Sequence, residues 1–133
     1  MDTDSQIKNK DCFPELGGVT RKVIGVLFDV YNELGYGYQE KLYYNAIKVR
    51  LLEKGLKVQE QLFCKIMAFG KPIGHFYLDF LIDDSVVLEL KVANGVYAKH
   101  IKQVLNYLKA NNLKLGIIGV FTKTGVEIKR VAN

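Results

Sequence analysis

Residues 79–91 read DFLIDDSVVLELK, which is two apolar runs on either side of a short polar turn. Because successive side chains of a strand point to opposite faces, each run has one wholly apolar face. The charged groups lie on the other face, Asp79 in the first run and Glu89 and Lys91 in the second. Two carboxylates and an ammonium on such a strand pair are costly unless they bind something, and a divalent metal with a phosphate would offset that cost.

The length of the turn decides whether these charged groups meet. A three-residue loop at 83–85 puts Asp79 opposite Glu89. A loop one residue shorter puts Asp79 opposite Leu88 and turns Glu89 and Lys91 away from it. A metal site therefore requires the three-residue loop or a bulge. The alternative is a hairpin whose second face is exposed and whose charged groups are merely solvated, an arrangement that is common in antiparallel sheets.

Composition limits the class of protein. The chain has 133 residues, of which 49% are hydrophobic and 25% charged, so it is long and apolar enough for one globular domain. No apolar run approaches the ~20 residues of a membrane span, and the polar start is not a signal peptide, so no membrane partner is expected. Cys12 and Cys64 are isolated, which favours a reducing cytoplasm. The net charge of +5 permits a nucleic-acid partner without establishing one.

Periodicity predicts the order helix, helix, three strands, helix, two strands. A flexible lead-in over 1–17 is expected before a single domain over 18–133. We expect helices from Thr20 to Leu34, from about Tyr38 to Lys54, and from about Tyr97 to Ala110. The second of these has Leu42, Ala46, Val49 and Leu52 on its apolar side. Strands are expected near 57–68, 73–82, 86–92, 114–121 and 125–131. A helix between the third and fourth strands is typical of a crossover between parallel strands. The fold class is therefore α/β (α+β), a mixed central sheet with helices packed on the face formed by Leu78, Phe80, Leu88 and Leu90.

Two motifs resemble a known family. The spacing of Asp79 and the segment ELK at 89–91 is similar to the core motif of the PD-(D/E)XK nuclease superfamily. The segment GYQEKLY at 37–43 resembles the signature of a bacterial family named GxxExxY after that motif. Further segments that resemble this family are YNELG at 31–35, QVLNYLK at 103–109 and IKRV at 128–131, so the likeness covers roughly residues 19 to 131. One departure is the segment GVF at 119–121, which stands where an Asn-Phe pair is expected.

The resemblance implies a restriction-endonuclease-like core of order ααβββαββ and a nuclease that depends on Mg²⁺ or Mn²⁺. Asp79 and Glu89 would be metal ligands, with the backbone carbonyl of Leu90 and the carboxylate of Glu40 as further ligands. Oxygen ligands of this kind are those that Mg²⁺ prefers. The implied partner is a nucleic acid, with DNA favoured over RNA, in a bacterial cytoplasm, and a homodimer is possible.

The catalytic residues implied by the resemblance extend beyond the carboxylates. Lys91 would orient the attacking water or neutralise the phosphate, and Gln103 would position water or substrate from the third helix. The full catalytic set is Asp79, Glu89, Lys91, Gln103 and Glu40. His100, on the opening turn of that helix, is expected to border the cleft without binding metal. Basic residues that could flank the cleft and contact phosphates are Lys41, Lys48, Arg50, Lys99, Lys102 and Lys109.

Each of these residues also has a purely structural explanation. Glu40 would be favoured in the first turn of any helix by the helix dipole, and Tyr43, one turn on, is expected to pack against Glu40 or hydrogen-bond to it. Gln103 and the lysines could be ordinary solvated helix residues. No aromatic platform indicates base reading. The alternative functions are therefore a non-catalytic nucleic-acid-binding or protein-interaction module with the nuclease fold, and a structural partner in a complex.

Overall fold

The computed structural model describes residues 13–94 and 98–133. The first twelve residues of the predicted lead-in, and Tyr97 at the predicted start of the third helix, lie outside the described residues. The remainder of the lead-in forms a short 3-10 helix, η1 (Pro14–Leu16), and the first α-helix begins at Gly17 instead of after Thr20. The first helix is therefore one turn longer than its sequence pattern predicted.

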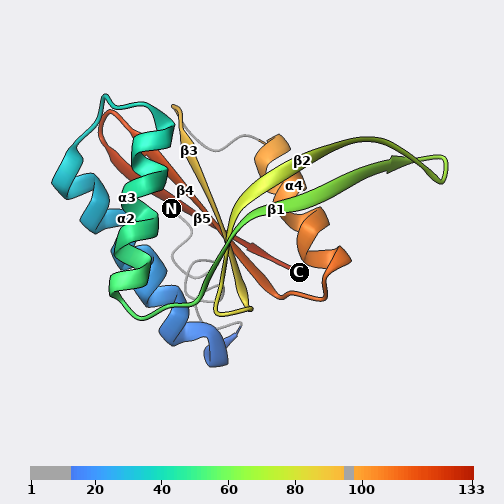
Figure 1. The fold of residues 1–133 in the computed structure, drawn as a ribbon, viewed down its shortest axis with the longest axis horizontal. Coiled ribbons are helices and arrows are strands. Elements are labelled where there is room, and N and C mark those ends of the chain that lie inside the picture. Colours follow the sequence, from blue (N-terminus) through green and yellow to red (C-terminus); the bar gives the residue numbers. More distant parts are fainter. Residues whose placement is uncertain (1–12, 95–97) are drawn as a thin grey trace, which may run out of the picture.

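The described elements follow the predicted order, as Figure 1 shows. They are α2 (Gly17–Leu34), α3 (Glu40–Glu53), β1 (Val58–Ala68), β2 (Lys71–Ile82), β3 (Val86–Val92), α4 (Ala98–Ala110), β4 (Leu115–Thr122) and β5 (Gly125–Ala132). The five strands form one sheet of order β1-β2-β3-β4-β5, in which β3 and β4 are parallel and every other pair is antiparallel. The mixed sheet and the crossover through α4 are thus confirmed. None of the described helices is long and apolar enough to cross a membrane.

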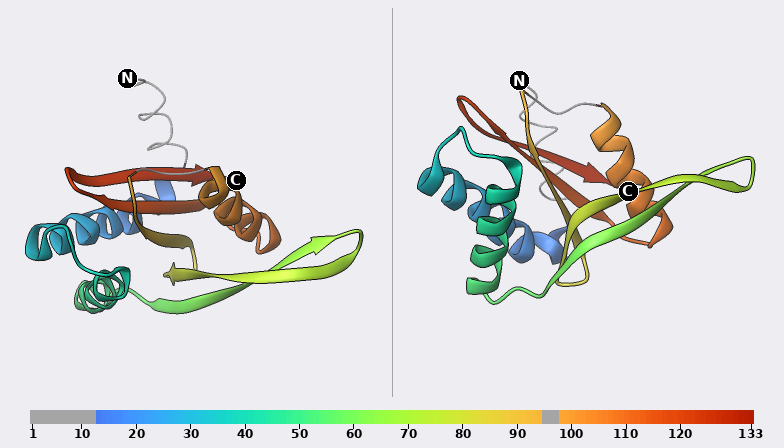
Figure 2. Two further views of the ribbon diagram at one scale, coloured as in Figure 1. Left: turned by 90° about the horizontal axis from the view of Figure 1, so that it is seen from above. Right: turned by 45° about the horizontal axis from the view of Figure 1, so that its top comes forward.

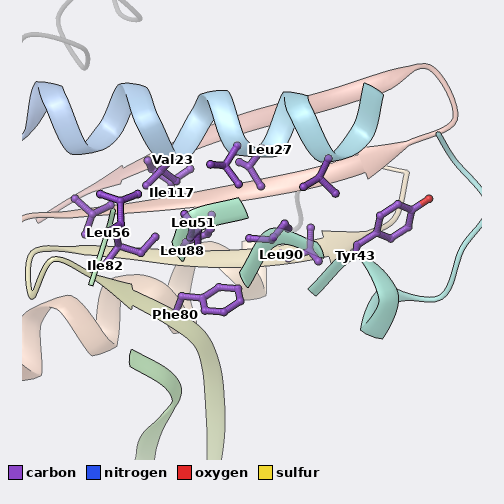
Figure 3. Packing of buried hydrophobic residues seen from close by; sticks show 14 of the residues in the cluster. Val23, Leu27, Tyr43, Leu51, Leu56, Phe80, Ile82, Leu88, Leu90 and Ile117 are labelled. Carbon is purple, nitrogen blue, oxygen red and sulfur yellow. The ribbon is translucent and has the colours of Figure 1, made fainter. Parts of the chain in front are cut away.

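Helices cover both faces of the sheet, so the core has two parts. On one face α2 and α3 pack against strand residues that include Phe80, Leu88 and Leu90, as Figure 3 shows. On the other face α4 packs through Val104 and Leu108. Because neighbouring residues of a strand point to opposite faces, the continuous apolar runs of β3 and β4 supply both parts of the core.

Two glycines of β4 allow the helices to approach the sheet closely. A Cβ atom at Gly116 would overlap the Val104 side chain of α4, and one at Gly119 would lie 2.7 Å from Leu27 Cδ1 of α2. Gly119 opens the segment GVF that stands where an Asn-Phe pair is expected, and a larger side chain at Gly119 would displace α2.

The buried side of α3 differs from the predicted one. The buried residues are Tyr43, Ile47 and Leu51, which are spaced four apart, whereas Leu42 and Leu52 of the predicted stripe are exposed. The hydroxyl of Tyr43 donates to the carbonyl of Gly35 and accepts from the backbone N–H of Tyr38, 3.2 Å away. These bonds hold Tyr43 inward and so fix the rotation of a helix that has apolar residues on several sides.

The predicted apolar face of β2 is interrupted at Asp79. Leu78 packs in the part of the core under α4, but Phe80 packs in the part under α2 and α3. The pairing of β1 with β2 is missing at this same point, where Gln61 has a φ of 56°. Beyond Asp79 the two strands continue as a long arm, residues 61–78, that leaves the body of the molecule (Figures 1 and 2). The alternation therefore changes sides where the arm begins.

Candidate functional site

The turn between β2 and β3 has the three-residue loop that a site at Asp79 requires. Ile82 pairs with Val86 and Phe80 pairs with Leu88, which leaves residues 83–85 as the loop. Asp83 is held in the loop because its carboxylate accepts from the backbone N–H of Lys57 at 2.8 Å. The next step of the register brings Asp79 opposite Glu89, and the regular ladder ends there.

The two carboxylates complete the hydrogen bonding where β2 and β3 separate. The backbone N–H of Leu90 donates to Asp79 Oδ2 at 2.8 Å, and the backbone N–H of Asp79 donates to Glu89 Oε1 at 2.9 Å. Each side chain thus satisfies a backbone donor of the opposite strand, which would otherwise be left without a partner. This exchange holds both carboxyl groups in the fork between the strands and uses one oxygen of each.

Burial sets the charge of this pair. Glu89 is only 3% exposed, and burial raises its pKa to about 8, with the negative charge of Asp79 acting in the same direction. Burial also raises the pKa of Asp79, although its hydrogen bond from Leu90 opposes this. The ammonium of Lys91, 3.3 Å from Glu89 Oε2, lowers both pKa values but does not cancel the effect of burial. At neutral pH the pair therefore holds a proton that a cation would have to displace.

Glu40 approaches this pair from α3. It is the first residue of that helix, and its negative charge contributes to the raised pKa of Asp79. Among the described residues, however, no three His, Cys, Asp or Glu side chains already form a metal-binding group. Glu40 thus lies within electrostatic reach of Asp79 without completing a three-carboxylate cluster among the described residues. The hydroxyl of Tyr43 bonds to backbone groups before the helix and not to Glu40, so the predicted hydrogen bond between the two side chains is not formed.

The third helix contributes His100 and Gln103. His100 is buried in the first turn of α4, and burial together with the positive charges of Lys91 and Lys99 lowers its pKa, while Glu40 raises it. His100 therefore lies within electrostatic range of both Lys91 and Glu40, in agreement with its predicted position beside the site. Gln103 follows three residues later, on the same side of the helix, and is half-buried.

A polar network beside Asp79 was not anticipated. Tyr44 donates to Glu60 Oε1 at 2.7 Å, and Lys48 Nζ lies 2.6 Å from Glu60 Oε2. The Tyr44 ring stacks on Phe80 with centroids 4.5 Å apart. Burial raises the pKa of Tyr44 to about 12, and the charge of Asp79 contributes. The signal in the sequence was the four-residue spacing of Glu40, Tyr44 and Lys48, which places them on one side of α3.

One of the predicted basic residues, Arg50, is used elsewhere. Arg50 binds Asp29 at 3.0 Å and Glu53 at 3.2 Å, and all three line a groove between α2 and α3. None of the predicted catalytic residues lines that groove. Arg50 is therefore engaged in surface ion pairs between the two helices, and the solvated-face explanation fits it better than a phosphate contact.

Comparison with known proteins agrees with the predicted fold class. The pattern of the PD-(D/E)XK nuclease superfamily matches residues 18–131. Among solved structures, the chain is similar to SSO0001, known from a crystal structure, with 15% identity and a TM-score of 0.44 over 88% of this chain and 79% of that one. No curated protein matches the sequence. Since the superfamily pattern spans nearly all of the described residues, the chain belongs to the PD-(D/E)XK nuclease superfamily.

Proposed function

We propose that this chain is a divalent-metal-dependent nuclease of the GxxExxY family that hydrolyses phosphodiester bonds, with DNA favoured over RNA. The observation that carries the proposal is the meeting of the Asp79 and Glu89 carboxyl groups in the fork between β2 and β3, with Lys91 Nζ 3.3 Å from Glu89. We assign the activity to a single domain over residues 18–133, in a bacterial cytoplasm, and allow for a homodimer.

The signature segment at 37–43 supports the narrower family assignment. Gly37 has a φ of 121°, a backbone conformation that residues other than glycine rarely adopt, and so allows the turn before α3. Glu40 begins the helix, and Tyr43 binds the turn from inside the core. Each named position of the signature thus has a physical task at the start of α3, where Glu40 lies within electrostatic reach of Asp79.

The donor set fits a hard divalent cation. The two strand carboxylates are adjacent, and each uses one oxygen for a backbone N–H. Their raised pKa values mean that a bound cation would release the proton that the pair holds at neutral pH. Asp79 and Glu89 would hold Mg²⁺ or Mn²⁺, with the Leu90 carbonyl and Glu40 as additional ligands. The bound ion would supply a hydroxide nucleophile near neutral pH and neutralise charge on the phosphoryl oxygens.

The remaining residues act on the substrate. The Lys91 ammonium is partly exposed, so it can contact a phosphate while it remains beside the carboxylate pair. It would orient the attacking water or balance the charge that develops on the phosphate. Gln103, on the half-buried side of α4, would use its amide to position water or substrate.

A non-catalytic binding module is the second candidate function. It is favoured by the lack, among the described residues, of a ready three-ligand cluster. The two candidates differ in their response to metal. A nuclease must gain activity with Mn²⁺ or Mg²⁺, whereas a binding module would bind nucleic acid equally well in a chelator and leave it intact.

The test is cleavage of plasmid, single-stranded DNA and RNA by the purified protein, with Mn²⁺ and with EDTA. Asp79→Asn and Glu89→Gln should each abolish metal-dependent cleavage and weaken Mn²⁺ binding. Lys91→Ala should lower cleavage far more than it lowers metal affinity. Glu53→Gln, which alters an exposed carboxylate in a surface ion pair, is the matched control and should retain full activity. A folded wild type that neither binds Mn²⁺ nor cuts any substrate would refute the nuclease assignment.

A further inference from the structure

The outer face of the β1–β2 arm is exposed, aromatic and basic. Residues 61–78 contain two lysines and one histidine but no aspartate or glutamate. On the arm, Phe63 pairs with Tyr77 and Lys65 pairs with His75, so these four side chains share one face. We refer to this group as the arm patch. Figures 1 and 2 show the β1–β2 arm extending beyond the helices.

The rings of the arm patch contact one another while they remain open to solvent. The centroids of Phe63 and His75 are 5.4 Å apart in a stacked arrangement, and those of Phe63 and Tyr77 are 5.6 Å apart edge to face. Phe63 is 51% exposed and Tyr77 is 50% exposed. Although the sequence shows no aromatic platform, the fold assembles one by pairing Phe63 of β1 with rings of β2 that lie twelve and fourteen positions later in the sequence. Exposed apolar groups that gather in this way mark binding surfaces.

The patch is presented by a firmly anchored strand pair. The opposite face of the arm is buried through Leu62, Cys64 and Leu78, which pack in the part of the core under α4. A loose arm is therefore not the reason that Phe63 and Tyr77 are exposed. Their exposure follows from the face on which they lie, and rings held in place lose little entropy when a flat ligand stacks on them.

The patch lies near the carboxylate pair along β2. Tyr77 lies two residues before Asp79 in β2, a separation of about 7 Å along a strand, and His75 lies about 13 Å away. Those distances correspond to a few nucleotides of a single strand. A nucleic acid whose phosphate is at Asp79 would therefore bring the neighbouring bases or phosphates to the arm.

We propose that the arm patch binds unpaired bases of the nucleic-acid substrate, with Phe63, His75 and Tyr77 stacking on bases and Lys65 pairing with a phosphate. This inference deepens the proposed function and rests on it for the identity of the ligand. Bases in a duplex already stack on each other, so exposed rings favour a single strand or the single-stranded flank of a duplex. The substrate class is therefore nucleic acid that is unpaired next to the point of cleavage.

Charge favours nucleic acid over a second copy of the chain as the occupant. A twofold dimer through this face would bring the same patch from both copies together, and hence would crowd the positive charges of Lys65 and its partner in a contact without carboxylates. Phosphates would instead neutralise this charge, and the flat aromatic rings match bases. The arm patch is thus complementary to a nucleic acid and not to itself.

The test is a set of binding measurements in EDTA, where cleavage does not interfere. The probes are a fluorescein-labelled oligothymidylate, the matching oligouridylate and a blunt DNA duplex, followed by fluorescence polarisation. Phe63→Ala and Tyr77→Ala should each weaken oligothymidylate binding by about 5- to 150-fold and leave duplex binding nearly unchanged. Tyr77→Phe should restore the affinity because it keeps the ring. Lys65→Ala should reduce the salt dependence of binding, with a slope smaller by about 0.7.

The matched control is Leu52→Ala, which removes a similarly exposed apolar side chain from α3. Unchanged single-strand affinity in both alanine variants of the arm would overturn the inference, and so would an equal loss for the duplex. A wild-type dimer in sedimentation that Phe63→Ala dissociates, without loss of nucleic-acid affinity, would also overturn it and assign the arm to self-association. Binding lost in the arm variants but retained in Glu89→Gln supports the inference even if no metal-dependent cleavage is found, an outcome that refutes the proposed function alone.

Discussion

Replacing Glu89 with glutamine should make the metal-free protein more stable at neutral pH while it weakens metal binding. The glutamine oxygen can still accept from the backbone N–H of Asp79, as Glu89 Oε1 does at 2.9 Å. Its amide nitrogen can donate to the Asp79 carboxylate, as a protonated Glu89 would. The variant therefore keeps the hydrogen bonding of the protonated site but has no proton to lose.

The size of the effect follows from the pKa of Glu89. Its pKa is raised from the ordinary value of 4.5 to about 8. Between these values the folded chain holds a proton that the unfolded chain has released, so the free energy of unfolding falls as pH rises. The loss approaches about 1.4 kcal/mol per pH unit, which is roughly 3 kcal/mol between pH 4.5 and 7. Coupling to Asp79 divides this titration between two groups, so we expect a gain of about 1 to 3 kcal/mol for Glu89→Gln at pH 7.

Urea unfolding of both proteins at several pH values in EDTA would measure this gain. The two unfolding free energies should converge near pH 4.5 and separate steadily up to about pH 8. Glu53→Gln, an exposed control, should follow the wild type because its ion pair with Arg50 contributes little. The reasoning would be refuted if Glu89→Gln were less stable than the wild type at pH 7, or if both lost stability with the same slope.

Three further predictions concern packing, the signature motif and metal binding. Gly116→Ala should lower the unfolding free energy by about 1 to 3 kcal/mol in thermal melts, because its Cβ would overlap the Val104 side chain of α4. The control Gly25→Ala adds a Cβ in open space on α2 and should raise the unfolding free energy by up to about 1 kcal/mol. Equal effects of the two substitutions would contradict this packing. Tyr43→Phe should lower the free energy of unfolding by about 1 to 2 kcal/mol because it removes the hydroxyl that bonds to the turn before α3. It should also lower cleavage without changing the affinity of the arm for a single strand. Full activity in this variant would show that cleavage does not depend on this turn. Mn²⁺ affinity should increase with pH up to about 8, because Glu89 must lose its proton before it can bind the metal. Calorimetric titrations in buffers of different ionisation enthalpy would measure the proton released on binding. A pH-independent affinity would argue against Glu89 as a ligand.

The local parts of the site were predictable because they depend on short-range rules. The alternation of apolar residues predicted the two strands, and register arithmetic showed that a three-residue loop would bring Asp79 opposite Glu89, although it left a shorter loop open. The crossover through α4 followed from the general preference for parallel strands on either side of a helix. These features need only the spacing of residues within one segment.

The features that the sequence did not reveal depend on contacts between distant segments. The buried side of α3 is selected by Tyr43 binding the preceding turn, although Leu42 and Leu52 are equally apolar. The change of face at Asp79 coincides with the positive φ of Gln61 on the neighbouring strand, which no periodicity in β2 encodes. The arm patch likewise requires the pairing of β1 with β2 before its rings become neighbours.

The hydrogen bonds in the fork determine which substitutions can separate structure from chemistry. Asp79 and Glu89 each accept from a backbone N–H of the opposite strand, so an alanine at either position removes both a possible metal ligand and the acceptor of a backbone donor. A donor left without a partner costs about 1 to 3 kcal/mol. Loss of activity in an alanine variant could therefore come from an opened fork as well as from a lost ligand. Asparagine and glutamine keep the acceptor oxygen and remove the negative charge, so only a loss in these variants assigns the charge itself to metal binding.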